Sequence, residues 1–283
     1  MLTVLEVIKK TTEFLAGKGI ESPRLNAELL VGHSLGLARM QLYLQFERPL
    51  TEAELEKIRP LVRRRGQHEP LQYVLGETEF FGLKLKVDRR SLIPRPETER
   101  LVELALAART SPPSTVLDLG TGTGAIALAI AKACAEAKVT AIDVSAEALA
   151  LARENAMATG LAERVDFLES DWFAALPAGA TFELIVANPP YLSAEETAAT
   201  AREVREFEPA SALTAGENGL AALRRIFEQA LSYLEPGGVL AVETGIHQHE
   251  QLRAIAEAAG YREFESRQDL TGRDRFVIAR REG

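Results

Sequence analysis

The 283-residue sequence predicts an α/β protein in which a small helical bundle precedes a mainly parallel β-sheet covered by helices on both faces. Two observations support this fold class. Up to about residue 75, apolar side chains recur at helical spacing and no strand pattern is present. From about residue 97 onward, short apolar strands alternate with helical segments, which is typical of a parallel sheet with crossover helices.

The N-terminal 75 residues predict four or five short helices. Thr3 with Glu6 has the spacing of a capping box, in which two side chains bond reciprocally to the backbone of the first helical turn. Thr51 with Glu54 repeats this pattern. Because no strand separates these helices, we expect them to pack together as a bundle.

The segment at 76–92 changes period. Residues 81–87 alternate apolar and polar side chains, which is the pattern of a half-buried strand. Together with residues 77–80 they predict a β-hairpin that links two domains. We therefore divide the chain into an N-terminal helical domain (1–75), the hairpin linker and a C-terminal domain (93–283).

The C-terminal domain alternates between helices and strands. Helices are expected at 97–109, at 125–137 and after Ser145. Strands are expected at residues 115–119, 138–143, 165–168, 183–187, 238–243 and 275–279.

A glycine-rich loop, Asp118-Leu-Gly-Thr-Gly-Thr-Gly-Ala125, joins the first of these strands to a helix. Its glycines permit a tight turn, and the start of the helix offers free N–H groups to a ligand. The loop also satisfies the dinucleotide fingerprint. It therefore predicts a nucleotide-type site without choosing between NAD and S-adenosylmethionine. The candidate cofactor-binding residues in it are Gly120, Thr121, Gly122, Thr123 and Gly124.

Acidic and aromatic side chains follow the next two strands. Asp143 lies 23 residues after Gly120, where a carboxylate can accept hydrogen bonds from both ribose hydroxyls. Both cofactors carry that ribose, so Asp143 leaves the choice open. Asp171 can accept a bond from an adenine amino group, and Trp172, the only tryptophan, can pack on the adenine ring.

The tetrapeptide Asn188-Pro189-Pro190-Tyr191 follows the fourth strand, at the edge where open α/β sheets bind ligands. Two prolines cannot extend a central strand, and they stiffen the turn. The Pro189 carbonyl and the Asn188 side-chain oxygen can then accept both N–H bonds of a substrate NH₂ group, while Tyr191 covers it. Such alignment suits methyl transfer to a planar, weakly nucleophilic nitrogen.

These motifs resemble the peptide-chain release factor glutamine-N5 methyltransferases (HemK/PrmC type). The tetrapeptide is similar to the signature of amino-methyltransferases, in which Asp, Asn or Ser precedes Pro-Pro and then Tyr or Phe. The glycine-rich loop resembles motif I of class I methyltransferases. The matching segments, in family order, are 69–76, 92–99, 118–125, 170–172, 188–191, 205–209 and 269–274.

The resemblance implies a Rossmann-like class I methyltransferase domain behind the helical domain and the hairpin linker. It implies that S-adenosylmethionine donates the methyl group, leaving S-adenosylhomocysteine. The implied acceptor is the glutamine of the Gly-Gly-Gln loop in class-1 peptide chain release factors, recognised with help from residues 1–75. Residues 188–191 would then be catalytic and substrate-binding, with Asn188 also close to the cofactor.

The composition bears on the alternatives. The net charge of −8 disfavours broad phosphate binding, so we expect no direct nucleic-acid contact, and a DNA adenine methyltransferase is the nearest rival. An NAD-dependent oxidoreductase and a non-catalytic scaffold are also considered, but both leave the tetrapeptide unexplained. No apolar run reaches the roughly 18 residues of a membrane span, and no signal peptide is recognised. We expect a cytoplasmic protein without membrane contact.

Other features have structural alternatives. Residues 192–218 form a long insertion, which we interpret as a partial lid over the acceptor. Arg95 and Glu97 could line the donor or acceptor pocket, or could act as capping or ion-pairing residues.

Three further features are interpreted as purely structural. Cys134 is expected to be a small core residue. His247-x-His249 lacks a matching set of metal ligands, so we expect a solvated loop and no metal. The arginines at 63–65 are expected to form a solvated helix end, with contact to an acidic partner as the alternative.

Overall fold

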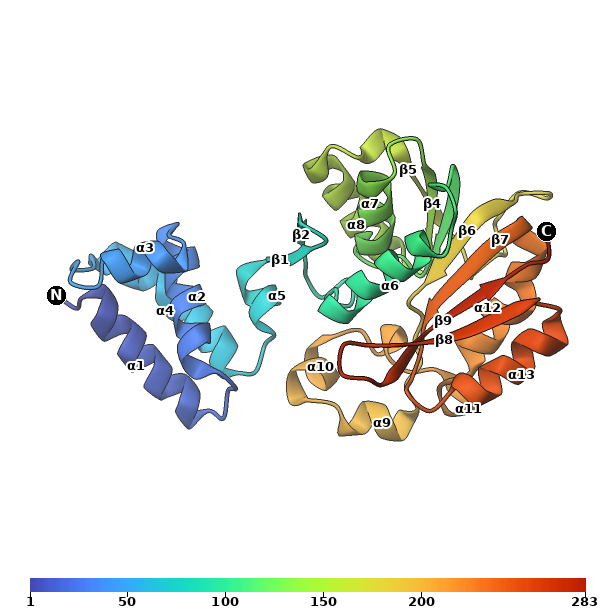
Figure 1. The fold of residues 1–283 in the computed structure, drawn as a ribbon. Helices are drawn as coiled ribbons and strands as arrows, with labels where there is room; N and C mark the ends of the chain where they lie inside the picture. Colours follow the sequence, from blue (N-terminus) through green and yellow to red (C-terminus); the bar gives the residue numbers. More distant parts are fainter. The chain divides into compact units, whose positions relative to one another are not determined.

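The computed structural model describes residues 1–283, which form two compact units (Figure 1). The first unit contains residues 1–76 together with 201–207, and the second contains residues 77–200 and 208–283. None of the helices combines the length and the apolar character needed to cross a membrane. Because the second unit begins at residue 77, the hairpin belongs to it. The assignment of substrate recognition to the N-terminal helices stays a prediction.

The first unit is helical, as the sequence predicted. Both capping boxes are present: the Glu6 amide donates to Thr3 Oγ1 at 3.2 Å, and the Glu54 amide donates to Thr51 Oγ1 at 3.3 Å. The helices of this unit are α1 (Val4–Gly17), α2 (Pro23–Leu35), α3 (Arg39–Leu44), α4 (Glu52–Gly66), α5 (Leu71–Leu75) and α10 (Arg202–Phe207).

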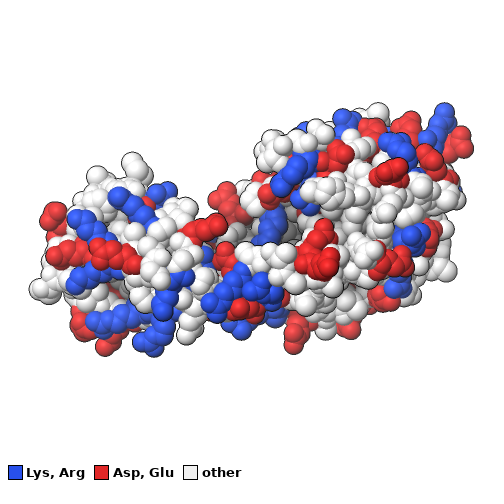
Figure 2. Space-filling view, turned by 90° about the horizontal axis from the view of Figure 1, so that it is seen from below, with Lys and Arg blue, Asp and Glu red and all other residues white.

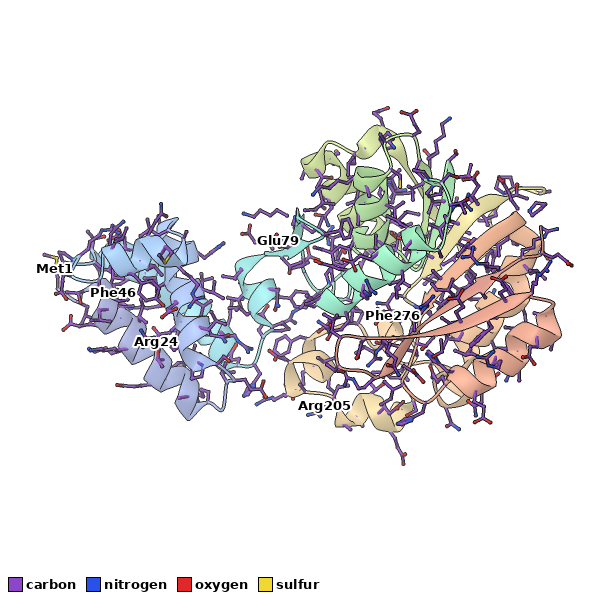
Figure 3. All side chains as sticks on the ribbon, in the orientation of Figure 1. Met1, Arg24, Phe46, Glu79, Arg205 and Phe276 are labelled. Carbon is purple, nitrogen blue, oxygen red and sulfur yellow. The ribbon has the colours of Figure 1, made fainter.

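Polar side chains are buried between the helices of the first unit. Glu28 on α2 accepts hydrogen bonds from Arg24, which Figure 3 labels, from Arg39 and from the Tyr43 hydroxyl. These donors and charges lower the pKa of Glu28 against the opposing effect of its burial. A buried carboxylate with several donors is stable where an unpaired one would not be.

The arginines at 63–65 lie in the last turn of α4, and the expectation of a solvated helix end is wrong for one of them, Arg65. Arg65 is only 5% exposed. Its guanidinium donates to the side-chain oxygen of Asn26 at 2.7 Å and to the Glu69 carbonyl at 2.9 Å, and it pairs with Glu203 at 2.7 Å. Arg64 pairs with the Glu69 carboxylate at 2.7 Å and keeps 40% of its side chain exposed, and Arg63 faces solvent.

The predicted hairpin is present at the start of the second unit. Strand β1 (Glu77–Phe80) pairs antiparallel with β2 (Leu83–Lys86). The two turn residues, Phe81 and Gly82, have φ values of +50° and +65°, as a tight hairpin turn requires. The strained Phe81 backbone is held because its N–H donates to the Glu99 carboxylate at 2.8 Å.

The second unit contains a seven-stranded sheet in the order β5-β4-β3-β6-β7-β9-β8. The first five strands in this order pair in parallel, and β9 and β8 are antiparallel additions at one edge. All six predicted strands are confirmed, whereas β8 was missed because its side chains are mostly exposed and polar. The strands are β3 (Thr115–Leu119), β4 (Lys138–Asp143), β5 (Val165–Glu169), β6 (Phe182–Ala187), β7 (Leu234–Glu243), β8 (Glu263–Gln268) and β9 (Asp274–Arg280).

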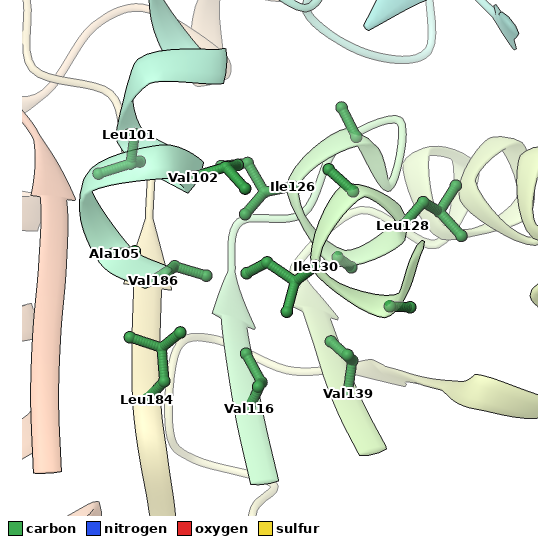
Figure 4. Packing of buried hydrophobic residues seen from close by; sticks show 14 of the residues in the cluster. Leu101, Val102, Ala105, Val116, Ile126, Leu128, Ile130, Val139, Leu184 and Val186 are labelled. Atoms are coloured by element: carbon green, nitrogen blue, oxygen red, sulfur yellow. The ribbon is translucent and has the colours of Figure 1, made fainter. Parts of the chain in front are cut away.

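Helices cover both faces of this sheet, and the two faces use alternate strand residues. On one face, Val116 and Leu184 pack with Ile126 and Ile130 of α7 (Figure 4). On the other face, Leu117 and its neighbours pack against α12 and α13. The helical elements are α6 (Pro96–Ala107), α7 (Ala125–Ala133), α8 (Ala146–Thr159), η1 (Ala162–Arg164), α9 (Ala194–Ala199), η2 (Ala210–Ala212), α11 (Gly216–Gly219), α12 (Ala221–Tyr233) and α13 (His249–Ala259).

Cys134 and His249 are both buried in the second unit. Cys134, at the end of α7, is a buried free thiol, as predicted. His249 is also buried, with 8% exposure, so the expectation of a solvated loop is wrong for it. Its ring nitrogens lie 2.7 Å from Thr244 Oγ1 and 2.6 Å from Ser266 Oγ, which explains its burial as a hydrogen-bonded link between α13 and the sheet.

Charged side chains of both signs are intermixed on the face drawn in Figure 2. Exposed ion pairs in the protein include Arg202 with Glu206 at 2.9 Å and Arg267 with Glu265. Exposed pairs of this kind contribute little to stability.

Arg65→Ala should therefore affect stability far more than a neighbouring substitution. It leaves the Asn26 oxygen and the Glu69 carbonyl without their donor, so we expect a loss of about 2–4 kcal/mol in the free energy of unfolding. The matched control is Arg63→Ala, which should stay within about 0.5 kcal/mol of the parent. Urea unfolding followed by circular dichroism measures both, and equal effects would contradict the assigned role.

Candidate active site

The sheet brings the predicted site residues to one edge. Leu119 at the end of β3 lies opposite Ala187 of β6 on one side and Ile142 of β4 on the other, in parallel register. The next residues along these three strands are Gly120, Asn188 and Asp143. Parallel strands end at the same edge, so the glycine-rich loop, the acceptor tetrapeptide (residues 188–191) and the acidic residue converge there.

A cavity of about 350 Å³ lies at this edge. Its volume is within the range of small-molecule sites in proteins. Of the residues predicted from sequence, those lining it are Gly120, Thr121, Gly122, Thr123, Asp143, Asp171, Trp172, Asn188 and Pro190. Gly124, Pro189 and Tyr191 do not line it, and their assigned roles stay predictions. Further lining residues, which the sequence did not single out, include Arg89, Arg90, Ser91, Thr98, Ser145 and Ser211.

The glycine-rich loop needs its glycines. Gly120, Gly122 and Gly124 have φ values of +72°, +57° and +82°, which side chains other than glycine rarely adopt. A Cβ atom at Gly122 would also lie 2.6 Å from Ser91 Oγ, and one at Gly124 would lie 3.2 Å from the Ala152 side chain. Both the backbone conformation and the close neighbours of the loop therefore require glycine at these positions.

Asp118 fixes the shape of this loop through hydrogen bonds. It is fully buried, and its Oδ2 accepts hydrogen bonds from Thr121 Oγ1 at 2.6 Å and from the Ala127 amide at 3.1 Å. Its Oδ1 has no partner, and burial raises the pKa of the carboxyl to about 7. Asp118 does not line the cavity, so its role is to hold the loop. Gly120, Gly122 and Asp143 do line it, and they are the groups that fit a nucleoside-type cofactor.

Asp143 also supports the loop. Its two oxygens accept hydrogen bonds from the Gly122 and Ser145 amides, each at 2.9 Å, and burial raises its pKa. Each carboxylate oxygen can accept a further hydrogen bond, so the side chain retains acceptors for ribose hydroxyls. That role stays a prediction.

Asp171 and Trp172 follow β5, which is separated in the sheet by β4 and β3 from β6, the strand that leads into the acceptor tetrapeptide. The Trp172 ring lies near Gly120, since a Cβ on that glycine would be 4.0 Å from it. The Asp171 side chain is 58% exposed and pairs with Arg225 at 2.8 Å. The carboxylate therefore has a partner already, and its bond to adenine stays a prediction.

The acceptor tetrapeptide is held by residues from other elements. The Asn188 amide group donates to Thr98 Oγ1 of α6 at 3.1 Å, which leaves its side-chain oxygen as the remaining acceptor. The Tyr191 hydroxyl donates to Glu243 at 3.0 Å, and the Tyr191 carbonyl accepts from Gln248 at 2.9 Å. Burial and the neighbouring Glu243 raise the pKa of Tyr191, so its hydroxyl stays protonated.

Sequence reasoning missed Thr98, Glu243 and Gln248. One signal could have identified Glu243, because a charged residue at the carboxyl end of an otherwise apolar strand is unusual. Gln248 follows five residues later, in the turn before α13, and has no comparable signal.

Arg95, Glu97 and the insertion at 192–218 differ in whether they line the cavity. Arg95 lines the cavity and pairs with Glu208 at 2.7 Å, so both roles considered for it are found. Glu97 lies in the first turn of α6 and does not line the cavity. Of the insertion at 192–218, residues 209, 211 and 212 line the cavity and 201–207 belong to the first unit; its function as a lid stays a prediction.

Comparison with known proteins defines the class first. Residues 111–272 match the family model of a methyltransferase domain, and residues 6–76 match the model of the PrmC N-terminal domain. Together with the fold and the site, these matches make the chain an S-adenosylmethionine-dependent methyltransferase, and the oxidoreductase and scaffold alternatives are set aside.

Full-length relatives define the family. The chain is 43% identical to the release factor glutamine methyltransferase of Geobacter sulfurreducens, over 98% of this chain and 96% of that protein. It is 44% identical to the protein of the same name from Chlorobaculum tepidum, over 85% of each chain. The chain belongs to the release factor glutamine methyltransferase family.

Solved structures support the fold alone, because their sequences are distant. The hMettl16 catalytic domain, solved with the MAT2A 3′UTR hairpin 6, has a TM-score of 0.56 and 16% identity, covering 82% of each chain. The T. thermophilus 16S rRNA N2 G1207 methyltransferase, solved with AdoMet and guanosine, has a TM-score of 0.52 and 19% identity. It covers 73% of this chain and 50% of that one.

Asp143→Ala should weaken the binding of S-adenosylmethionine or S-adenosylhomocysteine by about 1.5–3 kcal/mol, because a charged acceptor and the anchor of the Gly122 amide are both lost. Asp166→Ala, which removes an exposed carboxylate from the neighbouring strand β5, is the control and should leave affinity unchanged. Titration calorimetry measures both. Binding of NAD in place of the methyl donor, or an unaffected Asp143→Ala variant, would contradict the assignment.

Proposed function

We propose that this chain transfers a methyl group from S-adenosylmethionine to the side-chain nitrogen N5 of the glutamine in the Gly-Gly-Gln motif of class-1 peptide chain release factors. The names of its relatives support the substrate class. The observation that carries the proposal is the orientation of Asn188, whose amide group donates to Thr98 and whose oxygen is left for a substrate N–H bond.

The acceptor side of the mechanism follows from this orientation. The Asn188 oxygen and the Pro189 carbonyl accept the two N–H bonds of the glutamine amide, and Tyr191 covers the flat group. An amide nitrogen is a poor nucleophile because its lone pair is delocalised. Holding both N–H bonds out of the amide plane weakens that delocalisation and directs the lone pair toward the methyl group.

The donor side uses the glycine-rich loop and the residues around it. When bound, S-adenosylmethionine supplies a methyl group on a positively charged sulfur, which is an electrophile without further activation. Residues 120–124 would approach the cofactor with backbone groups, Asp143 would accept from its ribose, and Asp171 and Trp172 would contact its adenine.

The protein substrate would contact more than the active site. We assign the N-terminal helical unit to recognition of the release factor, since remote contacts can supply the energy that positions a weak nucleophile. The net charge of −8 supports a protein acceptor over duplex DNA. The one cysteine is a buried free thiol, compatible with the reducing cytoplasm in which translation ends.

Incubation with labelled S-adenosylmethionine should methylate a purified class-1 release factor once, at the Gly-Gly-Gln glutamine, as located by mass spectrometry. A release factor with Gln→Ala at that position is the control and should take up no label. A short peptide containing the motif should react with a much lower kcat/KM than the whole factor, because it lacks the remote contacts. Label in adenine of a parallel DNA sample, or in the Gln→Ala factor, would overturn the proposal.

Asn188→Ala should lower kcat by about 100-fold or more while changing donor affinity little, because its oxygen aligns the acceptor nitrogen. Single-turnover kinetics measures the first quantity and titration calorimetry the second. Retained donor binding serves as the control that the domain is folded. A variant with an undiminished single-turnover rate would show that Asn188 does not hold the acceptor.

A further inference from the structure

A buried carboxylate lies behind the acceptor tetrapeptide. Glu243, the last residue of β7, is 2% exposed and does not line the cavity. Its Oε2 accepts a hydrogen bond from the Thr98 hydroxyl at 2.7 Å, and its Oε1 accepts one from the Tyr191 hydroxyl at 3.0 Å. An ionisable group so deeply buried needs these donors to be tolerated.

The hydrogen bonds that link Asn188, Thr98, Glu243 and Tyr191 have a fixed direction, because each group has a limited number of protons to donate. An ionised carboxylate can only accept, so Thr98 and Tyr191 must both donate to Glu243. A hydroxyl has a single proton, so Thr98 can only accept from Asn188. The Asn188 side chain must then turn its NH₂ group toward Thr98, at 3.1 Å, and keep its oxygen for the substrate.

The backbone of Tyr191 is held as well, by Gln248 and Gly219. Gln248 donates to the Tyr191 carbonyl at 2.9 Å, while its own side-chain oxygen accepts from the Gly245 amide at 2.8 Å. Gly219 packs against this carbonyl so closely that a Cβ would lie 2.2 Å from it. The tyrosine is therefore fixed at its hydroxyl and at its backbone, and Asn188 remains the one acceptor side chain whose orientation could reverse.

Charged groups from several elements face this carboxylate. Burial raises the pKa of Glu243, and Glu97 of α6 raises it further. The donors Thr98 and Tyr191 lower it, as does Arg275 of β9, whose guanidinium lies 5.6 Å from the centre of the Tyr191 ring. Because the pKa is raised, the carboxylate protonates at a higher pH than an exposed glutamate would.

We propose that Glu243 is a positioning residue that, through Thr98, sets the amide orientation of Asn188 and thereby makes the site select substrates that donate N–H bonds. If Asn188 were reversed, its NH₂ group would face the cavity and repel the NH₂ group of the substrate. The proposal rests on the proposed function, in which Asn188 accepts from the glutamine amide. It adds a residue outside the cavity that determines which group the site can recognise.

The variant Glu243→Gln is nearly isosteric and tests the direction of the hydrogen bonds. Its amide can donate to Thr98, which can then donate to Asn188 and reverse it. We expect kcat on the release factor to fall by at least about 10-fold, the size expected when one positioning contact is lost. The affinity for S-adenosylhomocysteine should stay within a factor of a few, since Glu243 does not line the cavity. The control is Glu257→Gln on the exposed side of α13, which should behave as the parent.

A pair of variants at Thr98 makes the test independent of the fold of the Glu243 variant. Thr98→Val removes the hydroxyl at nearly constant volume and should lower kcat to a similar extent. Thr98→Ser keeps the hydroxyl and should restore most of the rate. A merely structural role of the hydroxyl would lower the affinity of Thr98→Val for S-adenosylhomocysteine together with kcat, whereas a positioning role lowers kcat and leaves that affinity nearly unchanged, so titration calorimetry separates the two.

The pH profile provides the last readout. Glu243 must be ionised to accept both bonds, so kcat of the parent should be present above its raised pKa and be lost as the pH falls through it. This acidic limb should be absent in Glu243→Gln. Full activity of Glu243→Gln, or equal rates for Thr98→Ser and Thr98→Val, would overturn the inference. Failure of the proposed function is distinguishable, because the parent itself would then methylate no release factor.

Discussion

The parallel pairing of β3 with β6 is the contact on which the active site depends. It places the end of the strand that leads into the glycine-rich loop beside the end of the strand that leads into Asn188. Gly120 and Asn188 are 68 positions apart in the sequence yet become neighbours, because both strands run in the same direction and end at the same edge. Apolar side chains on both faces of these strands stabilise that register, since slipping by one residue would turn each of them to the opposite face and disrupt its packing.

The glycine-rich loop and the acceptor tetrapeptide are then held in place by hydrogen bonds from side chains outside them. For the loop it comes from Asp118 and Asp143, whose oxygens bond to backbone amides. For the tetrapeptide it comes from Glu243, at the end of β7, and from Gln248, in the turn that follows. In both places a buried carboxylate accepts several hydrogen bonds, and its inability to donate defines how the groups around it are turned.

Most of the fold follows from local patterns. The capping boxes at Thr3 and Thr51, the hairpin and six strands were predicted because the signal in each case lies within a few residues. Strand β8 was not, because an edge strand with exposed side chains needs no apolar alternation. Arg65 and His249 were misjudged because the partners that make their burial favourable lie far away in sequence, such as Asn26, which is 39 positions from Arg65.

The sequence by itself determined the class of the site: the glycines that only a left-handed backbone explains, the strand-end acidic residues and the rigid Asn188 to Tyr191 turn are all chemically specific at short range. Only the tertiary structure decided which way Asn188 faces. That choice depends on Thr98 from α6 and Glu243 from β7, which are 90 and 55 positions away from it in the chain. A hydrogen bond between distant elements leaves no local pattern, because its energy depends on the distance that the folded sheet imposes and not on the neighbours of either residue.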